Sequence, residues 1–334
     1  MGLAVALLIL AIARRRGADL DAADERWILG LGALGPIIHL LMDGLNIYGI
    51  HPFWPVYDGW IYGDAVFIVE PLLWLTAVPF LFADARTAPT RAVLILLVIA
   101  GLGLPWLVPG FVPLPVRIAL LVIFAIMVVL ARVFEGTRRA AIGLGAFFGV
   151  PVVFLAASTL AHLSIERRAM AEFPGEKLVD AATTSWPSNP LCWSAVLVST
   201  TQAGDLVLRR VTFALTPSVM SVESCPLREE AITAPLHPVG APNDIATRWE
   251  GEHRIDLARL RYLAESRCDV AALMRFMRAP FIAERGETFV VGDLRFDRDE
   301  KLDFAELELP IDPPNECPRF VPSWTPPRAD ILSP

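Results

Sequence analysis

The sequence predicts a membrane α-helical bundle of five to six spans in residues 1–163, followed by a soluble extracytoplasmic α+β domain in residues 164–334. Three observations lead to this fold class. Long apolar runs end near Leu163, most charged residues and prolines follow that point, and all four cysteines lie after it. The chain is 54% hydrophobic and 19% charged, with a mean hydropathy of +0.51, which favours a membrane protein over a soluble one.

Six apolar segments make up the predicted bundle. A membrane span needs about 20 residues, within a range of about 17 to 25. The segments are Met1–Ala13, Trp27–Leu45, Ala65–Ala83, Ala92–Val108, Ile118–Val133 and Ala140–Leu163. The first is short, and its basic cluster Arg14-Arg15-Arg16 follows the apolar stretch, unlike the order in a signal peptide. We therefore expect the chain to begin inside what was a full span.

Arginine placement orients the predicted bundle. Alternate connections carry the positive charge, at Arg14–Arg16, at Arg86 and Arg91, and at residues 132–139, whereas the intervening ones lack Lys and Arg until Arg117. Cytoplasmic loops are enriched in these residues. The loop 46–64 and the C-terminal domain are thus expected outside the cytoplasm.

The cysteines agree with that location. An even number of them in an extracytoplasmic domain predicts two disulfides with three possible connectivities, and four separate buried thiols are the alternative. Their spacing fits no compact zinc motif. The four are Cys192, Cys225, Cys268 and Cys317.

Polar residues interrupt the second apolar segment. His39 and Asp43 are four residues apart and Asn46 is three further on, so all three lie on one helical face. An imidazole and a carboxylate one turn apart can bind a metal, or can form a structural pair. Ionisable groups inside a membrane usually mark a site, and we therefore expect metal or catalytic use.

Two acids follow, one directly before the third segment and one inside it. Asp64 is a candidate for the same site, or it caps a helix that begins at Ala65. Glu70 lies inside the apolar run and needs a partner there, such as His39 or a bound cation. His51, in the loop between the polar helix and Asp64, is either an extra metal ligand or incidental. His162, at the end of the sixth segment, is expected at the membrane interface.

The loop "NIYGIHPFWPVYDGWIYGD" is rich in aromatic residues. These residues are interfacial anchors or the wall of a cleft that admits lipid headgroups. They are Trp54, Tyr57, Trp60 and Tyr62.

Local patterns predict the elements of the soluble domain. Residues 193–215 form a β-hairpin, 256–278 have helical periodicity, and 287–296 form a strand. The acidic run 297–303 is expected to be a turn, because Lys301 and Leu302 do not fit a calcium loop. The Pro-rich tail from Pro310 to Pro334 is expected to be extended.

Several function classes are excluded. The net charge is −7 and no basic stripe with interleaved aromatics occurs, which argues against nucleic acid as a partner. No nucleophile elbow, P-loop or Rossmann fingerprint is present.

The stretch from His39 to Leu75 resembles a known family. His39, Asp43, Asn46, Tyr48-Gly49, Pro52-Phe53, Asp64, Phe67-Ile68 and Glu70-Pro71 resemble the pattern of the YdjM/YbcI-like bacterial inner-membrane metal-dependent hydrolases, with Glu70 in place of the usual Asp. Residues 187–193 and 274–296 are similar to segments of longer members. Relatives carry further upstream ligands, a Pro-Asp-x-Asp-like and a His-Arg-Gly-x-Thr-His-Ser-like element, and this chain begins after them.

The resemblance implies a function. A divalent metal, in such sites zinc, activates water to attack an ester or phosphoester of a lipid-linked or envelope substrate at the bacterial cytoplasmic membrane. In that scheme His39 and Asp43 bind the metal, Asn46 and Tyr48 orient a ligand or substrate, and Asp64 or Glu70 is a ligand or base.

Two other functions fit the same sequence. One is a non-catalytic membrane scaffold or envelope-stress protein, with a structural polar stripe and a partner-binding C-terminal domain. The other is a transporter, since polar residues within spans also suit an ion path, although no inverted repeat is evident.

Overall fold

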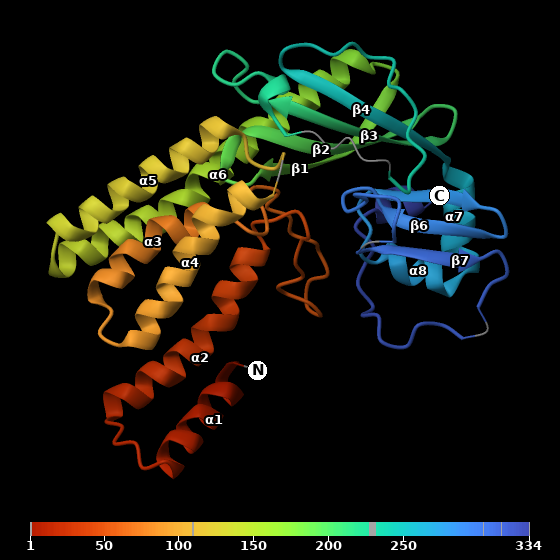
Figure 1. Ribbon diagram of the computed structural model, residues 1–334. Helices are drawn as coiled ribbons and strands as arrows, with labels where there is room; N and C mark the ends of the chain where they lie inside the picture. Colours follow the sequence, from red (N-terminus) through yellow and green to blue (C-terminus); the bar gives the residue numbers. More distant parts are fainter. Residues whose placement is uncertain (1, 109, 227–231, 303, 315, 334) are drawn as a thin grey trace. The chain divides into compact units, whose positions relative to one another are not determined.

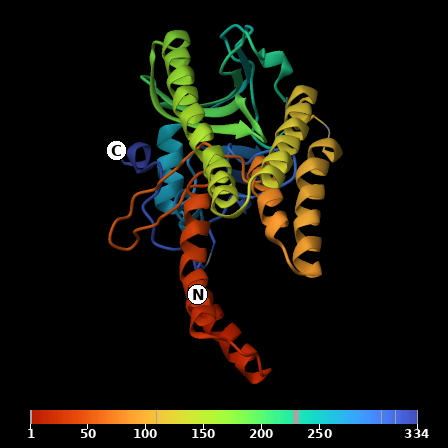
Figure 2. The ribbon, with the colours of Figure 1, turned by 90° about the vertical axis from the view of Figure 1, so that its left-hand side faces the viewer.

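The computed structural model describes residues 2–108, 110–226, 232–302, 304–314 and 316–333. The chain divides into two compact units, Met1–Gly63 and Asp64–Pro334. Figures 1 and 2 show the elements of each unit from two sides.

The first unit is a helical hairpin followed by a loop. Helix α1 (Gly2–Arg15) packs against helix α2 (Ala22–Asp43). The side chain of Asp21 accepts hydrogen bonds from the backbone N–H groups of Ala23 and Asp24, and the Asp24 side chain accepts one from the backbone of Asp21. This capping box satisfies N–H groups that the first helical turn leaves unpaired. The loop after α2 closes with a β-bridge between Ile50 and Ile61.

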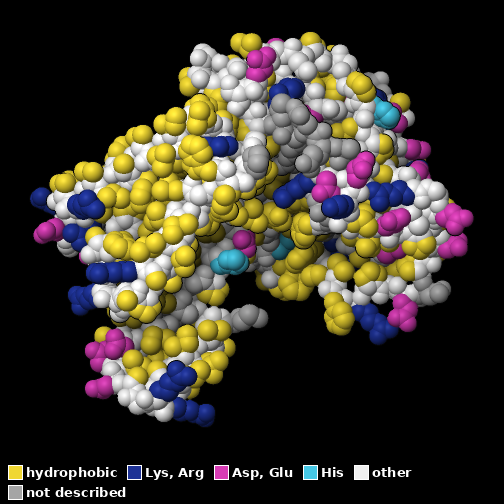
Figure 3. All heavy atoms as spheres, in the orientation of Figure 1, with side chains coloured by type: hydrophobic (Ala, Val, Ile, Leu, Met, Phe, Trp, Pro, Cys, Tyr) yellow, Lys and Arg dark blue, Asp and Glu magenta, His cyan; other side chains and the backbone are white. Residues whose placement is uncertain are grey.

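Four apolar helices begin the second unit. They are α3 (Pro71–Asp84), α4 (Ala88–Leu107), α5 (Leu114–Val133) and α6 (Gly136–Glu172). Helix α3 packs against the other three, and Figure 3 shows hydrophobic side chains over the visible face of these helices. Gly143 of α6 permits a close approach, because a Cβ there would lie 2.8 Å from Cγ of Phe80 in α3.

Three helices are long and apolar enough to cross a membrane among the described residues, namely α4, α5 and α6. The predicted order of apolar helices able to span a membrane followed by a sheet-containing domain is thereby confirmed, whereas only these three of the predicted five to six spans meet both requirements. Helices α1 and α3 have 14 residues each, below the length of a span. Helix α2 has 22 residues but carries three charged residues in its first turns and His39 and Asp43 near its end.

The predicted start of the third helical segment, at Ala65, is wrong. Residues 65–70 are not helical, and α3 begins only at Pro71. The predicted helix cap at Asp64 is therefore also wrong, and Glu70 caps α3 instead. Side chains of the second unit satisfy this irregular backbone: Ser158 donates to the carbonyl of Asp64 over 3.1 Å, and Ser185 donates to that of Ala65 over 2.8 Å.

Helix α6 is longer than a membrane span requires. Its 37 residues span about 55 Å at about 1.5 Å per residue, whereas the hydrocarbon core is about 30 Å thick. It runs unbroken through the predicted domain boundary at residue 163. The C-terminal part of α6 lies along the first sheet (Figure 1).

The first sheet is antiparallel, with the strand order β1-β2-β3-β4. Its strands are β1 (Glu176–Trp186), β2 (Asn189–Thr201), β3 (Asp205–Ala214) and β4 (Thr247–Asp256). Strands β2 and β3 form the hairpin predicted for residues 193–215.

Both faces of the first sheet are buried. On β2, Trp193 and Leu197 pack in one cluster with the α6 residues Ala161 and Ile165. The intervening residue Val196 packs in a second cluster, with residues of the second sheet. This alternation follows from the two-residue period of a strand, and it explains why β2 has no clear polar face.

A second sheet and short helices complete the fold. The second sheet is antiparallel in the order β5-β6-β7. The elements are η1 (Val222–Ser224), α7 (Leu257–Ser266), α8 (Cys268–Met274), β5 (Pro280–Arg285), β6 (Thr288–Asp293), β7 (Glu306–Pro310) and α9 (Ala329–Leu332). Strand β6 confirms the prediction for residues 287–296. The single helix predicted for residues 256–278 is instead α7 and α8, separated at Arg267, whose backbone is extended.

Two disulfides join the four cysteines, as predicted. Cys192 pairs with Cys225, and Cys268 pairs with Cys317. The first joins β2 to the segment after η1, and the second joins α8 to the C-terminal tail. Disulfides of this kind are typical of an oxidising compartment.

Candidate functional site

A buried ion pair joins the segment before the apolar helices to the sheet domain. Nη1 of Arg278 lies 2.8 and 2.7 Å from the two carboxylate oxygens of Asp64. Both residues are at most 5% exposed. Asp64 has a φ of +49°, a left-handed conformation that Asp tolerates better than most residues. That turn directs the chain from the aromatic loop into the segment before α3.

The same guanidinium also holds Asp180 of β1. Nε of Arg278 lies 2.6 Å from one carboxylate oxygen of Asp180, and Nη2 lies 2.9 Å from the other. Arg328, near the C-terminus, lies 3.1 Å from the same carboxylate. Burial favours a higher pKa for Asp180, but the hydrogen bonds and charge of Arg278, with Arg328 beside it, outweigh burial and lower that pKa.

His162 of α6 completes the arrangement. Its Nε2 lies 3.3 Å from the Asp64 carboxylate. Its Nδ1 lies 3.1 Å from the carbonyl oxygen of Ser158 and 3.2 Å from Oγ1 of Thr183 in β1. The side chain is 28% exposed, so the predicted interfacial histidine is a partner of Asp64.

We call this group the junction network; it comprises Asp64, His162, Asp180, Arg278 and Arg328. Two carboxylates face two guanidinium groups, so the buried charges of opposite sign are balanced. Buried pairs of this kind are costly to break, because the remaining charge has no solvent to stabilise it. Each carboxylate and each imidazole nitrogen already contacts another protein group, which suits the network to holding the bundle and the sheet domain together.

Glu70 has a structural partner in the sheet domain. One carboxylate oxygen accepts hydrogen bonds from the Leu72 N–H and the Ser188 hydroxyl, and the other accepts one from the Ser188 N–H. Glu70 is 2% exposed. Burial raises the pKa of the Glu70 carboxyl to about 7, against the opposing effect of these hydrogen bonds.

Glu70 is expected to make stability depend on pH. The folded state binds the Glu70 proton more tightly than the unfolded state, so stability falls as the pH rises from about 4.5 to about 7 and then levels off. The loss amounts to up to about 3 kcal/mol. Thermal unfolding of the purified protein in detergent between pH 5 and 8 measures it.

Glu70→Gln should flatten this profile, because glutamine does not titrate. Glu265→Gln, at an exposed position of α7, should retain the wild-type profile. A Glu70→Gln protein with the full wild-type pH dependence would show that another group causes it.

The predicted metal ligands lie in the first unit. Nε2 of His39 is 3.4 Å from Oδ2 of Asp43, and their side chains are 79% and 44% exposed. The side chain of Asn46 accepts a hydrogen bond from the Tyr48 N–H over 2.8 Å, so Asn46 stabilises the turn after α2. His51 lies 3.2 Å from Asp58 and packs edge-on against Trp60.

The described residues contain no group of three or more His, Cys, Asp or Glu side chains placed to hold a metal ion. His39 and Asp43 thus supply two donors, fewer than the three protein ligands typical of a catalytic zinc site.

The sequence did not reveal the main parts of the junction network. Asp64 and His162 were noted, but Asp180, Arg278 and Arg328 were not. A signal was present at Arg278, which stands between apolar residues in "FMRAPF". A buried arginine in such a run needs a carboxylate partner.

No family model, curated protein or solved structure matches this chain.

Proposed function

We propose that this chain is a non-catalytic integral membrane protein that anchors a disulfide-bonded, partner-binding domain at the extracytoplasmic face of a bacterial cytoplasmic membrane. The junction network and the contact between Glu70 and Ser188 carry the proposal. Asp64 and Glu70, the two carboxylates expected to be catalytic, both bind the sheet domain, through Arg278 and Ser188. Side chains with these contacts hold two parts of the protein together, which is a structural role.

Helix α6 supports the anchoring role. It is continuous from the apolar bundle to the first sheet, and its small residues Ala157 and Ala161 pack in one cluster with that sheet. A rigid helix with a buried ionic contact at its side fixes the domain relative to the membrane helices, whereas a flexible linker would leave it free.

The exposed surface of the domain supports partner binding. Three large apolar side chains of β7 and the tail are open to solvent: Leu307 is 43% exposed, Ile311 61% and Phe320 96%. Such side chains favour a protein partner where they form one contiguous patch.

Charge supports the proposed orientation. Arg139 of α6 lies 2.8 Å from Asp84 of α3, so the end of α3 and the start of α6 share one end of the bundle. Arg86 and Arg91 lie at the α3–α4 connection, and Arg132 lies at the end of α5, next to the start of α6. Figure 3 shows Lys and Arg side chains gathered at that end. The sheet domain follows the other end of α6. An excess of arginine on the cytoplasmic side then leaves the sheet domain outside.

A membrane-impermeant maleimide tests this orientation in intact cells. Ala203→Cys, in the exposed β2–β3 turn, should react, and Thr137→Cys, at the exposed start of α6, should react only after lysis. The opposite pattern would place the domain in the cytoplasm and overturn the anchoring proposal.

A metal-dependent hydrolase is the second candidate, and the one-turn spacing of His39 and Asp43 favours it. It requires a metal bound at that pair. If the purified full chain holds about one equivalent of zinc, and His39→Ala and Asp43→Ala remove it without unfolding the protein, the hydrolase is the better proposal. Zinc content that does not depend on either residue leaves the anchoring role in place.

A further inference from the structure

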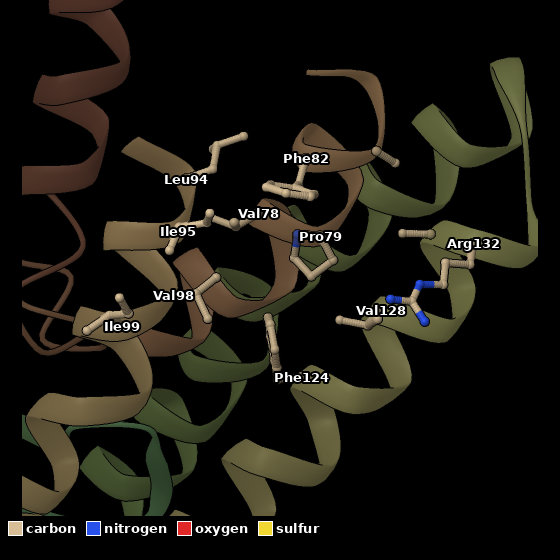
Figure 4. A pocket seen from close by; sticks show the side chains of 12 residues that line it. Val78, Pro79, Phe82, Leu94, Ile95, Val98, Ile99, Phe124, Val128 and Arg132 are labelled. Carbon is tan, nitrogen blue, oxygen red and sulfur yellow. The ribbon is translucent and has the colours of Figure 1, made fainter. Parts of the chain in front are cut away.

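A cavity opens between the apolar helices α3, α4 and α5, away from the junction network. Its volume is about 350 Å³, within the range of about 300–1,000 Å³ of small-ligand sites. Val78 and Pro79 of α3, Val98 of α4, and Phe124 and Val128 of α5 line it. Figure 4 shows these side chains around the opening.

Pro79 lines this cavity. It lies inside α3, where a proline ring cannot donate a hydrogen bond to the carbonyl of Leu75 and disturbs the regular helix. The lining is almost entirely apolar and lies on helices long or apolar enough to face lipid. A hydrocarbon chain matches the chemistry of such a space.

One charged residue stands at the cavity. Arg132 of α5 is the only charged lining residue, and Figure 4 shows its guanidinium turned toward Val128 and Pro79. Arg132 makes no ion pair with any residue that the structure describes. Arg132 is exposed in the last turn of α5, where a long basic side chain reaches the headgroup region, and a guanidinium binds phosphate oxygens strongly through paired hydrogen bonds.

We propose that this cavity binds one anionic phospholipid, with an acyl chain between α3, α4 and α5 and its phosphate on Arg132. Apolar lining alone does not select a ligand inside a bilayer, because the surrounding lipid tails are equally apolar. Selectivity therefore comes from Arg132. Basic pockets between membrane helices bind anionic headgroups in this way, and Arg86, Arg91 and Arg138 at the same end add to the attraction.

Native mass spectrometry of the detergent-purified full chain tests the proposal, with phosphatidylglycerol and phosphatidylcholine of equal chain length as probes. The wild-type protein should retain one phosphatidylglycerol with about tenfold preference, because phosphatidylcholine has the same phosphate but also a choline cation, which weakens its attraction to Arg132 by roughly the strength of one charge-assisted hydrogen bond. Arg132→Gln should lower retention to the phosphatidylcholine level. Val98→Phe, which fills the cavity from α4, should weaken retention of both lipids.

Arg138→Gln is the matched control. Arg138 lies at the same end of the bundle but does not line the cavity, so this variant should keep the preference. Equal retention of the two lipids by the wild-type protein would overturn the proposal. An equal loss in Arg132→Gln and Arg138→Gln would also overturn it, because it would show general attraction to a basic surface.

Discussion

Arg278→Met is expected to lower the free energy of unfolding by about 3–5 kcal/mol, because it leaves two buried carboxylates without their shared partner. Asp64 would lose both of its Arg278 contacts, and Asp180 would retain only Arg328. Methionine keeps much of the volume of the side chain, so the loss reports the charge. Denaturant unfolding in detergent measures it, and limited proteolysis should detect cleavage in residues 64–70.

A rescue variant distinguishes the ionic contact from a general packing defect. Adding Asp64→Asn and Asp180→Asn to Arg278→Met removes the uncompensated charges and should recover part of the lost stability. Arg259→Met is the control. Its ion pair with Glu284 lies at the surface, with side chains 49% and 56% exposed, and such pairs contribute about 0–1 kcal/mol. Equal effects of Arg278→Met and Arg259→Met would contradict a structural role for the junction network.

The sequence predicted the elements whose signal is local. Apolar runs located α4, α5 and α6, and strand alternation located the β2–β3 hairpin, because helix and strand periods are written in neighbouring residues. The cysteine count predicted two disulfides but could not choose their pairing. Only the fold brings Cys192 near Cys225 and Cys268 near Cys317.

The start of α3 was within reach of the sequence and was missed. Glu70 followed by Pro71 is a typical helix start, since proline favours the first helical position and an acid can cap it. Apolar composition across residues 65–70 hid this signal. The backbone there can leave the helix because Ser158 and Ser185, far along the chain, satisfy its carbonyl groups.

The junction network was beyond sequence reasoning for a different reason. Asp64 and Arg278 are 214 positions apart, and their contact depends on how α6, β1 and the segment after α8 are arranged in space. A local pattern shows that a buried charge needs a partner, but not which one. The same limit applies to His39 and Asp43, whose spacing matches a metal-binding helix but does not say which other side chains would complete a site.

The C-terminal tail depends on a disulfide as well as on this network. Arg328 ties the tail to Asp180, and Ile331 of α9 is buried in the core with Leu260 of α7. Between these contacts and β7, Cys317 is bonded to Cys268 at the start of α8. The described part of the tail is therefore held at both ends of its Pro-rich stretch, and the expectation of an extended tail is wrong for Ala329–Leu332, which form helix α9.

Replacing Cys268 and Cys317 by serine together is expected to destabilise the domain by about 4 kcal/mol, the loop-closure entropy of a 49-residue separation. Thermal unfolding in detergent measures the loss, and proteolysis should cut the variant between residues 311 and 327, where the wild-type protein resists. Cys192→Ser with Cys225→Ser is the matched control: its 33-residue separation predicts a similar loss, but without cleavage of the tail. Because reduction would have the same effect as the substitutions, a reducing agent should lower the stability of the wild-type protein but not that of a chain lacking all four cysteines. If the reductant leaves the wild-type protein unchanged, the disulfides do not stabilise the domain, and its proposed placement in an oxidising compartment loses that support.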